Sequence, residues 1–99
     1  MIRQDIDIAG YWYVIVFYNV NTPELNQGFT YTDTIQRKSV VVIGNTDSLQ
    51  QFYNTVVHEA KQLQSAICRY YDVSEDSEDA AYLIGYIVMK MSECFSRYT

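Results

Sequence analysis

Apolar residues gather in three short runs in the first half of the chain. Residues Tyr11–Tyr18 are aromatic or β-branched almost throughout, which is typical of a strand, and the missing polar alternation predicts that both of its faces are covered. Phe29–Thr32 alternates and predicts a short second strand. Ser39–Ile43 predicts a third strand that ends at Gly44, and the polar stretch Asn19–Gln27 predicts a loop.

The second half of the chain changes to helical spacing. Ser48 predicts a helix start, with Gln51 reaching back toward it as in a capping box. Apolar residues then recur at helical intervals to about Tyr71. A second helix is predicted from about Ser77 to Phe95. Its acidic first turn suits the helix dipole, and its middle is apolar nearly all round, which predicts the central buried helix of the fold.

Strands followed by helices are the order of an α+β domain. We therefore expect a small sheet of two to four strands packed against two helices. The 99 residues form a single domain, 1–99, with no internal repeat and no linker. A composition of 48% hydrophobic and 19% charged residues is that of a globular chain rather than a disordered one.

Charge and hydropathy exclude several classes of function. The net charge of −5 argues against a nucleic-acid partner, since the chain has only one adjacent basic pair, Arg37–Lys38. The longest apolar run, Ala80–Met89, is far shorter than the roughly 18 residues of a membrane span. No targeting segment is visible, so we expect a cytoplasmic protein with no membrane partner. Cys68 and Cys94 form no CxxC pair and are expected to be buried thiols.

The single histidine marks the candidate chemistry, within His58-Glu59-Ala60-Lys61-Gln62. At about 100° per residue, His58 and Gln62 lie one turn apart on the outward face of the predicted helix. Glu59 falls at the margin of the apolar stripe, where a carboxylate beside a histidine can have a tuned pKa. Taken alone, a His, a Glu and a Gln on one helix are usually a solvated face.

The segment Thr55–Leu63 resembles the active helix of zincin metallopeptidases, in which two histidines one turn apart and a glutamate between them build a zinc site. The later segment Glu78–Tyr86 resembles the second helix of small gluzincin-like proteins from phages and bacterial mobile elements. The strand Ser39–Ile43 ahead of the first helix also fits. The resemblance runs from Ser39 to Met91, roughly half of the chain, and implies a zincin-like fold.

The resemblance implies roles for four residues. His58 matches the first zinc ligand, Glu59 the general base, and Glu78, ahead of the Ala-Tyr-Leu pattern, the third ligand. Gln62 stands where the family has its second histidine, and an amide is a poorer zinc ligand than an imidazole. The nearby carboxylates that could replace it, although the helix dipole also explains them, are Glu75, Asp76 and Asp79.

Three hypotheses follow. The favoured one is a degenerate zincin-like protein without peptidase activity or cofactor, which binds a peptide or a protein partner, because losing one ligand weakens a small zinc site. The second is a weak zinc peptidase with His58 and Glu78 as ligands and Glu59 as general base. The third is a small interaction protein of a mobile element, whose ten tyrosines and strand edge form a homodimer or partner interface. In the first two, His58, Glu59, Gln62 and Glu78 converge in one shallow cleft.

Overall fold

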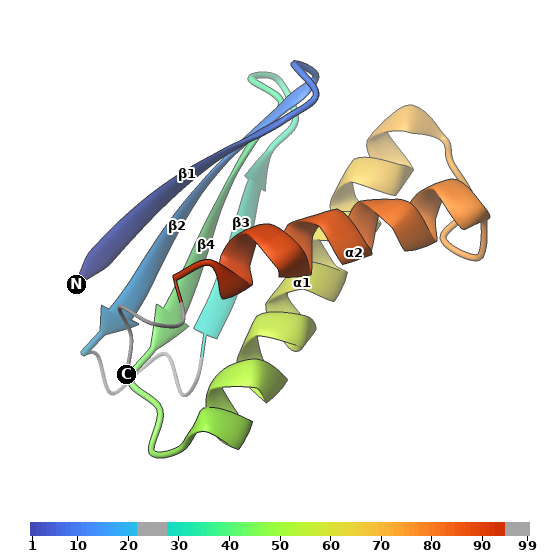
Figure 1. Cartoon of the computed structure of the whole chain (residues 1–99). Coiled ribbons are helices and arrows are strands. Elements are labelled where there is room, and N and C mark those ends of the chain that lie inside the picture. Colours follow the sequence, from blue (N-terminus) through green and yellow to red (C-terminus); the bar gives the residue numbers. More distant parts are fainter. Residues whose placement is uncertain (22–27, 95–99) are drawn as a thin grey trace.

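The computed structural model describes residues 1–21 and 28–94, which form four strands and two helices (Figure 1). In chain order they are β1 (Ile2–Ile8), β2 (Trp12–Val20), β3 (Gly28–Asp33), β4 (Lys38–Gly44), α1 (Leu49–Tyr71) and α2 (Glu78–Ser92). The fold is α+β, as the order of strands and helices predicts. Within the described residues, neither helix has the length and apolar character needed to cross a membrane.

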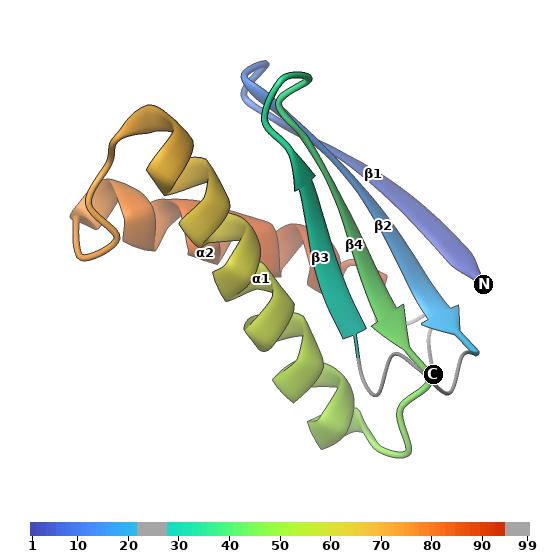
Figure 2. The same cartoon turned by 180° about the vertical axis from the view of Figure 1, so that it is seen from behind.

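The four strands form one mixed sheet in the order β1-β2-β4-β3. The central strands β2 and β4 are parallel, and each outer strand is antiparallel to its neighbour. Both helices lie on the same face of this sheet, and the opposite face carries no helix among the described residues (Figures 1 and 2). The prediction that both faces of Tyr11–Tyr18 are covered is therefore wrong. Tyr13, on the uncovered face, is 37% exposed, whereas Val14 and Val16 on the other face are fully buried.

Strand β1 was not predicted, although its pattern alternates. Ile6 and Ile8 are buried under the helices, while Asp5 and Asp7 point to the uncovered face. β1 pairs along its whole length with β2, from Ile2 opposite Tyr18 to Ile8 opposite Trp12. The charged half of the strand explains why hydrophobicity alone does not reveal it.

The core lies between the helix-covered face of the sheet and the two helices. Its fully buried larger side chains include Trp12, Val14, Val16, Tyr18, Val41, Ile43, Phe52, Val56, Leu63, Ile87 and Met91. A chain of hydrogen bonds crosses the sheet inside this core. Trp12 Nε1 donates to Ser39 Oγ at 3.1 Å, and Ser39 Oγ lies 2.9 Å from Thr32 Oγ1, so β2, β4 and β3 are linked through polar side chains as well as backbone.

The predicted start of α1 is confirmed, with one difference in its cap. Ser48 Oγ accepts a hydrogen bond from the Gln51 backbone N–H at 3.1 Å. The Gln51 side chain reaches back one residue further than expected and accepts from the Asp47 N–H rather than from Ser48. The helix ends at Asp72, which takes a left-handed conformation with φ of 55°.

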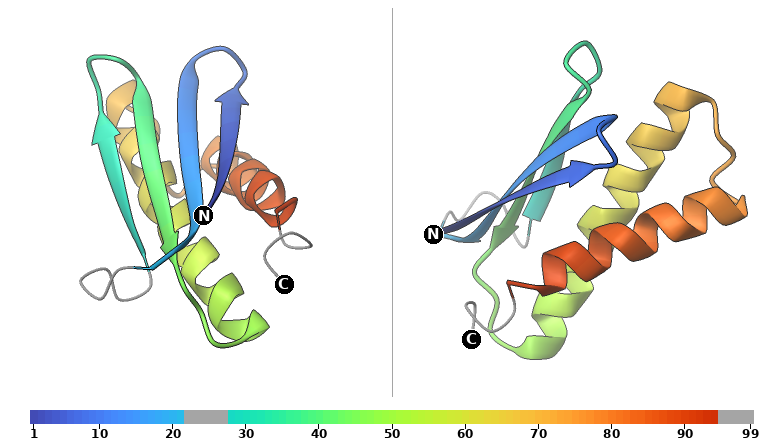
Figure 3. Two further views of the ribbon diagram at one scale, coloured as in Figure 1. Left: turned by 90° about the vertical axis from the view of Figure 1, so that its left-hand side faces the viewer. Right: turned by 45° about the horizontal axis from the view of Figure 1, so that its top comes forward.

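Helix α2 is not the central buried helix. Only Ala80, Ile87 and Met91 are buried in it, because it covers β1 and β2 at one side of the sheet while α1 covers β3 and β4 (Figure 3). Gln4 Nε2 donates to the Lys90 carbonyl, and the buried Tyr18 hydroxyl lies 3.1 Å from the Met91 carbonyl, so the end of α2 is held to both strands. Burial raises the pKa of the Tyr18 hydroxyl far above its ordinary value.

Three further expectations concern the ends of elements and the thiols. The second helix was predicted to run to about Phe95, but α2 ends at Ser92, with Glu93 as its C-cap. Phe95 itself and most of the predicted loop Asn19–Gln27 lie outside the described residues. Cys68 and Cys94 are buried and form no disulfide, as predicted.

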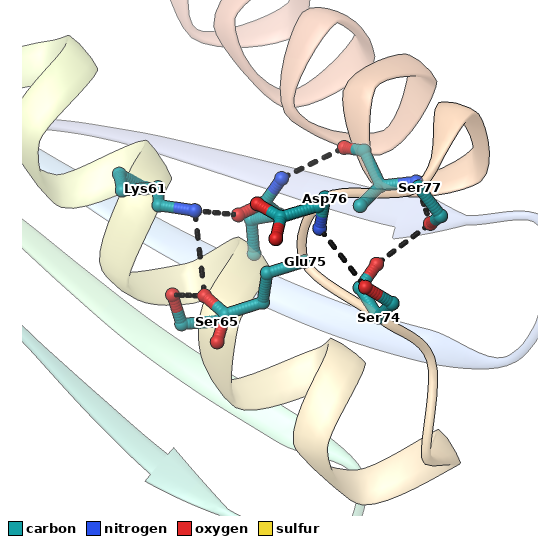
Figure 4. Close-up of polar contacts among 8 residues, drawn as sticks. Lys61, Ser65, Ser74, Glu75, Asp76 and Ser77 are labelled. Carbon is teal, nitrogen blue, oxygen red and sulfur yellow. Dashed lines mark hydrogen bonds and ion pairs between the residues drawn. The ribbon is translucent and has the colours of Figure 1, made fainter.

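The connection between the two helices is held by a polar cluster (Figure 4). Glu75 accepts hydrogen bonds from Ser65 Oγ and, at 3.3 Å, from Lys61 Nζ. Lys61 Nζ also donates to Gln64 Oε1 at 2.7 Å, and Gln64 Nε2 donates to the Ala80 carbonyl at 2.8 Å. This cluster fixes the first turn of α2 against the C-terminal half of α1. The hydrogen bond from Ser65, followed by that from Lys61, holds the pKa of Glu75 below its ordinary value.

Replacing Glu75 by Gln should lower the melting temperature at neutral pH. The depressed pKa means that the ionised carboxylate favours the folded state, a contribution present above the ordinary pKa of 4.5 and lost as the pH falls through the folded value. The difference in melting temperature between wild type and Glu75→Gln should therefore shrink below pH 4.5. Asp76→Asn, the same charge change at the neighbouring residue, is the control. If the Glu75→Gln and Asp76→Asn proteins had the same melting temperature at every pH, the proposed role of the Glu75 carboxylate would be contradicted.

Candidate functional site

The start of β3, the end of β4 and the first half of α1 surround a polar cavity of about 550 Å³. It contains two of the residues singled out from the sequence, His58 and Glu59. The remaining lining residues are Gly28, Asn45, Asp47, Gln51, Asn54 and Thr55. The lining is thus made mainly of amides, hydroxyls and carboxylates, which suits a polar ligand rather than an apolar one.

Glu59 is the buried acid of this cavity, with 2% of its surface exposed. The helix spacing places it at the margin of the apolar stripe, and in the structure that margin faces β3. Thr30 Oγ1 donates to Glu59 Oε1 at 2.8 Å. A buried carboxylate needs such a partner, because burial without hydrogen bonds costs far more than burial of an apolar group.

Gly28 allows β3 to begin this close to α1. A Cβ atom on this residue would lie 2.5 Å from the Val42 carbonyl oxygen. It would also lie 3.2 Å from Thr55 Cγ2 and 3.3 Å from Glu59 Cγ. Any side chain at residue 28 would therefore push the strand away from the neighbouring strand and from the helix.

His58 and Gln62 lie together at the outer side of Glu59, as their spacing predicts. The side chain of His58 is 67% exposed, and its Nε2 lies 3.8 Å from Glu59 Oε2. Gln62 Nε2 lies 3.1 Å from His58 Nε2. Because an amide nitrogen only donates, the ring nitrogen accepts in this contact. A metal on this nitrogen would have to displace Gln62 from it.

A second hollow continues along β3 on the other side of the bond between Thr30 and Glu59. Its volume is about 330 Å³. It is lined by Thr30, Thr32, Lys61, Gln62, Ser65, Ala66 and Arg69. We call the two hollows together the β3–α1 groove. β3 is an edge strand, paired only with β4 among the described residues, so the groove follows an open sheet edge.

Glu78 lies apart from the other three residues. It is the first residue of α2, whose first turn is fixed to Gln64 through the Ala80 carbonyl. Gln64 is six residues beyond His58, which places it about 9 Å along α1 and roughly 120° around it. Glu78 is exposed and lines neither hollow of the β3–α1 groove. The structure thus brings His58, Glu59 and Gln62 together but not Glu78.

The carboxylates close to Glu78 in sequence, which could have replaced the missing zinc ligand, also do not lie beside His58. Glu75 belongs to the cluster with Lys61 and Ser65, and Asp79 lines a different cavity. Across residues 1–21 and 28–94, no three His, Cys, Asp or Glu side chains are grouped so that they could hold a metal ion.

Two important residues of the site, Thr30 and Gly28, were not singled out from the sequence. The alternation of Phe29–Thr32 does place Thr30 and Thr32 on one face of a strand, which the structure confirms. The partner of that face cannot be read from alternation, since it depends on where α1 crosses the sheet.

Replacing Thr30 by Val should destabilise the fold by about 1–3 kcal/mol, because the isosteric side chain leaves the buried Glu59 carboxylate without its donor. In a Glu59→Leu background the same Thr30→Val change should cost about 0.5 kcal/mol or less, since no carboxylate remains to be satisfied. Urea unfolding of the four proteins gives the coupling energy between the two positions. Equal costs in both backgrounds would show that this hydrogen bond contributes nothing.

Comparison of the chain with protein-family models, with curated proteins and with solved structures gives no match.

Proposed function

We propose that this protein is a zincin-related binding module that holds an extended peptide in the β3–α1 groove without cutting it. One observation carries the proposal: an open strand edge runs beside a polar groove, and the carboxylate that resembles the family's general base is tied to that strand by Thr30. The groove therefore has the features of a peptide-binding cleft. The components of a zinc centre are not grouped beside it among the described residues.

The edge of β3 supports binding by strand addition. In an antiparallel pair, alternate residues direct both backbone N–H and C=O away from the partner strand. β3 spans the six residues Gly28–Asp33, and its only described neighbour is β4. An extended peptide can satisfy the outward groups while its side chains alternate between the groove and the solvent.

The charges along the groove favour a particular peptide. The larger hollow contains the carboxylates of Asp47 and Glu59. The smaller hollow contains Arg69 and also Lys61, whose Nζ is bound to Gln64 and Glu75, so Arg69 is the cation that this hollow offers to a ligand. Side chains two residues apart on a strand share one face and are separated by about 7 Å. We therefore propose a ligand with a basic and an acidic side chain two positions apart, one on each side of the bond between Thr30 and Glu59.

The second hypothesis, a weak zinc peptidase with His58 and Glu78 as ligands and Glu59 as general base, has less support. A catalytic zinc ion normally has three protein ligands and one open position. Glu78 lies on the other helix and lines neither hollow of the β3–α1 groove, and the His58 Nε2 atom accepts from Gln62. We therefore favour binding over catalysis.

Selection of random linear peptides against the purified protein should enrich sequences with a basic and an acidic residue two positions apart. Their affinity should fall at least about tenfold in Asn54→Trp, because a large ring at this exposed position fills the larger hollow. Gln50→Trp is the matched control: residue 50 is exposed one helical turn earlier but does not line the groove. Peptides that bind Asn54→Trp as tightly as wild type, or that mass spectrometry finds cleaved, would contradict the proposal.

Replacing Gln62 by His should raise zinc affinity, since it places a second imidazole one turn from His58, at the position of the present hydrogen-bond partner. Wild type should retain no stoichiometric zinc after purification without a chelator or an affinity tag, as measured by elemental analysis. The double variant Gln62→His with His58→Ala is the control and should lose the gain. Stoichiometric zinc in wild type that disappears in His58→Ala would favour the peptidase hypothesis instead.

A further inference from the structure

An apolar cavity of about 260 Å³ lies where the C-terminal end of α1 meets the start of α2 and the turn between β1 and β2. Its lining residues are Tyr11, Ile67, Cys68, Tyr71, Val73, Asp79, Ala80 and Leu83. A second hollow of about 540 Å³ shares Tyr11, Asp79 and Leu83, so the two adjoin. It adds Ile8, Ala9, Tyr82 and Tyr86. None of these residues lines the β3–α1 groove, and this site is independent of the proposed function.

The aromatic walls of the cavity are held in place by contacts of their own. Tyr11 and Tyr71 meet edge to face, with ring centroids 5.5 Å apart. The Tyr71 hydroxyl donates to the Tyr11 carbonyl at 3.0 Å, and its ring also packs against Trp12. Tyr82, 70% exposed, stands at the rim of the outer hollow. A ligand would thus meet a preformed site and would not have to order these walls.

Among the described residues that line either hollow, Asp79 is the one with a charged side chain. No hydrogen bond or ion pair joins its side chain to another described residue, and Lys61 on α1 is bound to Glu75 instead. The chain carries a net charge of −5. Asp79 is exposed in the first turn of α2. A neutral ligand gains nothing from this charge, whereas a cation beside it is attracted by it.

The tyrosines add to the preference for a cation. The face of an aromatic ring carries partial negative charge and attracts cations. One such cation–π contact exists at the edge of the site, where Lys90 Nζ lies 5.7 Å from the centroid of the Tyr86 ring. Tyr11, Tyr71 and Tyr82 are close to the cavity and have no such cation among the described residues.

We propose that this cavity binds a compact organic cation with an apolar body, of the quaternary ammonium class. The methyl groups lie against Tyr11, Tyr71 and Leu83, and the charge is balanced by Asp79 at the shared wall of the two hollows. Apolar area, aromatic faces and one carboxylate together are the features that such cations require.

Titration of the full chain with choline, followed by amide NMR shifts, tests the proposal. Choline should shift the resonances of Ile67, Cys68, Ala80 and Leu83, with an affinity at least about fivefold above that of 3,3-dimethylbutan-1-ol. This alcohol has the shape of choline but carbon in place of the charged nitrogen. Equal affinity for both compounds would show an apolar pocket without preference for a cation, and no shift with choline would show no site at all. Either result would overturn the proposal.

Two matched variants test the role of the carboxylate. Asp79→Asn should weaken choline binding about fivefold and leave the alcohol unaffected, because only the charge is lost. Asp76→Asn removes the same charge from an exposed residue that does not line the cavity, and it should change choline affinity less than about twofold. A folded Asp79→Asn protein, judged by its amide spectrum, that binds choline as tightly as wild type would contradict the assignment.

Discussion

A buried carboxylate has to be satisfied by hydrogen bonds, and Glu59 meets this requirement through Thr30. The bond can form only because β3 starts at Gly28, where a side chain would collide with the neighbouring strand and with α1. One polar contact thus fixes the edge strand against the helix and divides the space between them into two hollows. The proposed peptide site therefore has Asp47 and Glu59 on one side of this contact and Lys61 and Arg69 on the other.

The two helices divide the covered face of a small sheet between them, and each side of α1 consequently meets different chemistry. Toward β3 it presents His58, Glu59 and Gln62 to a polar groove. Toward α2 it presents Ile67, Cys68 and Tyr71 to an apolar cavity that Asp79 and Leu83 also line. The cluster of Glu75, Lys61 and Ser65 holds the start of α2 against the C-terminal half of α1. Glu78, at the start of α2, is therefore kept away from His58.

Local sequence patterns predict most of the strands and helices that the structure contains. β2 and β4 follow from runs of β-branched and aromatic residues, β3 from alternation, and both helices from helical periodicity. The Ser48 cap follows from its spacing to Gln51. β1 was not predicted because three of its seven residues, Arg3, Asp5 and Asp7, are charged and face the uncovered side of the sheet. The site was predictable only within one helix, where spacing relates His58, Glu59 and Gln62. The contact with Thr30 and the separation of Glu78 depend on how elements distant in sequence pack, which no local pattern encodes.

The central claim is that His58 belongs to a binding groove and not to a metal centre. Because the chain has one histidine, its ring nitrogens can be observed alone by long-range ¹H–¹⁵N NMR. At about pH 8, above the ordinary pKa of an imidazole, the account predicts a proton on Nδ1, an accepting Nε2, and no change when equimolar zinc is added. A proton on Nε2, or a shift of Nε2 with the first equivalent of zinc, would contradict it.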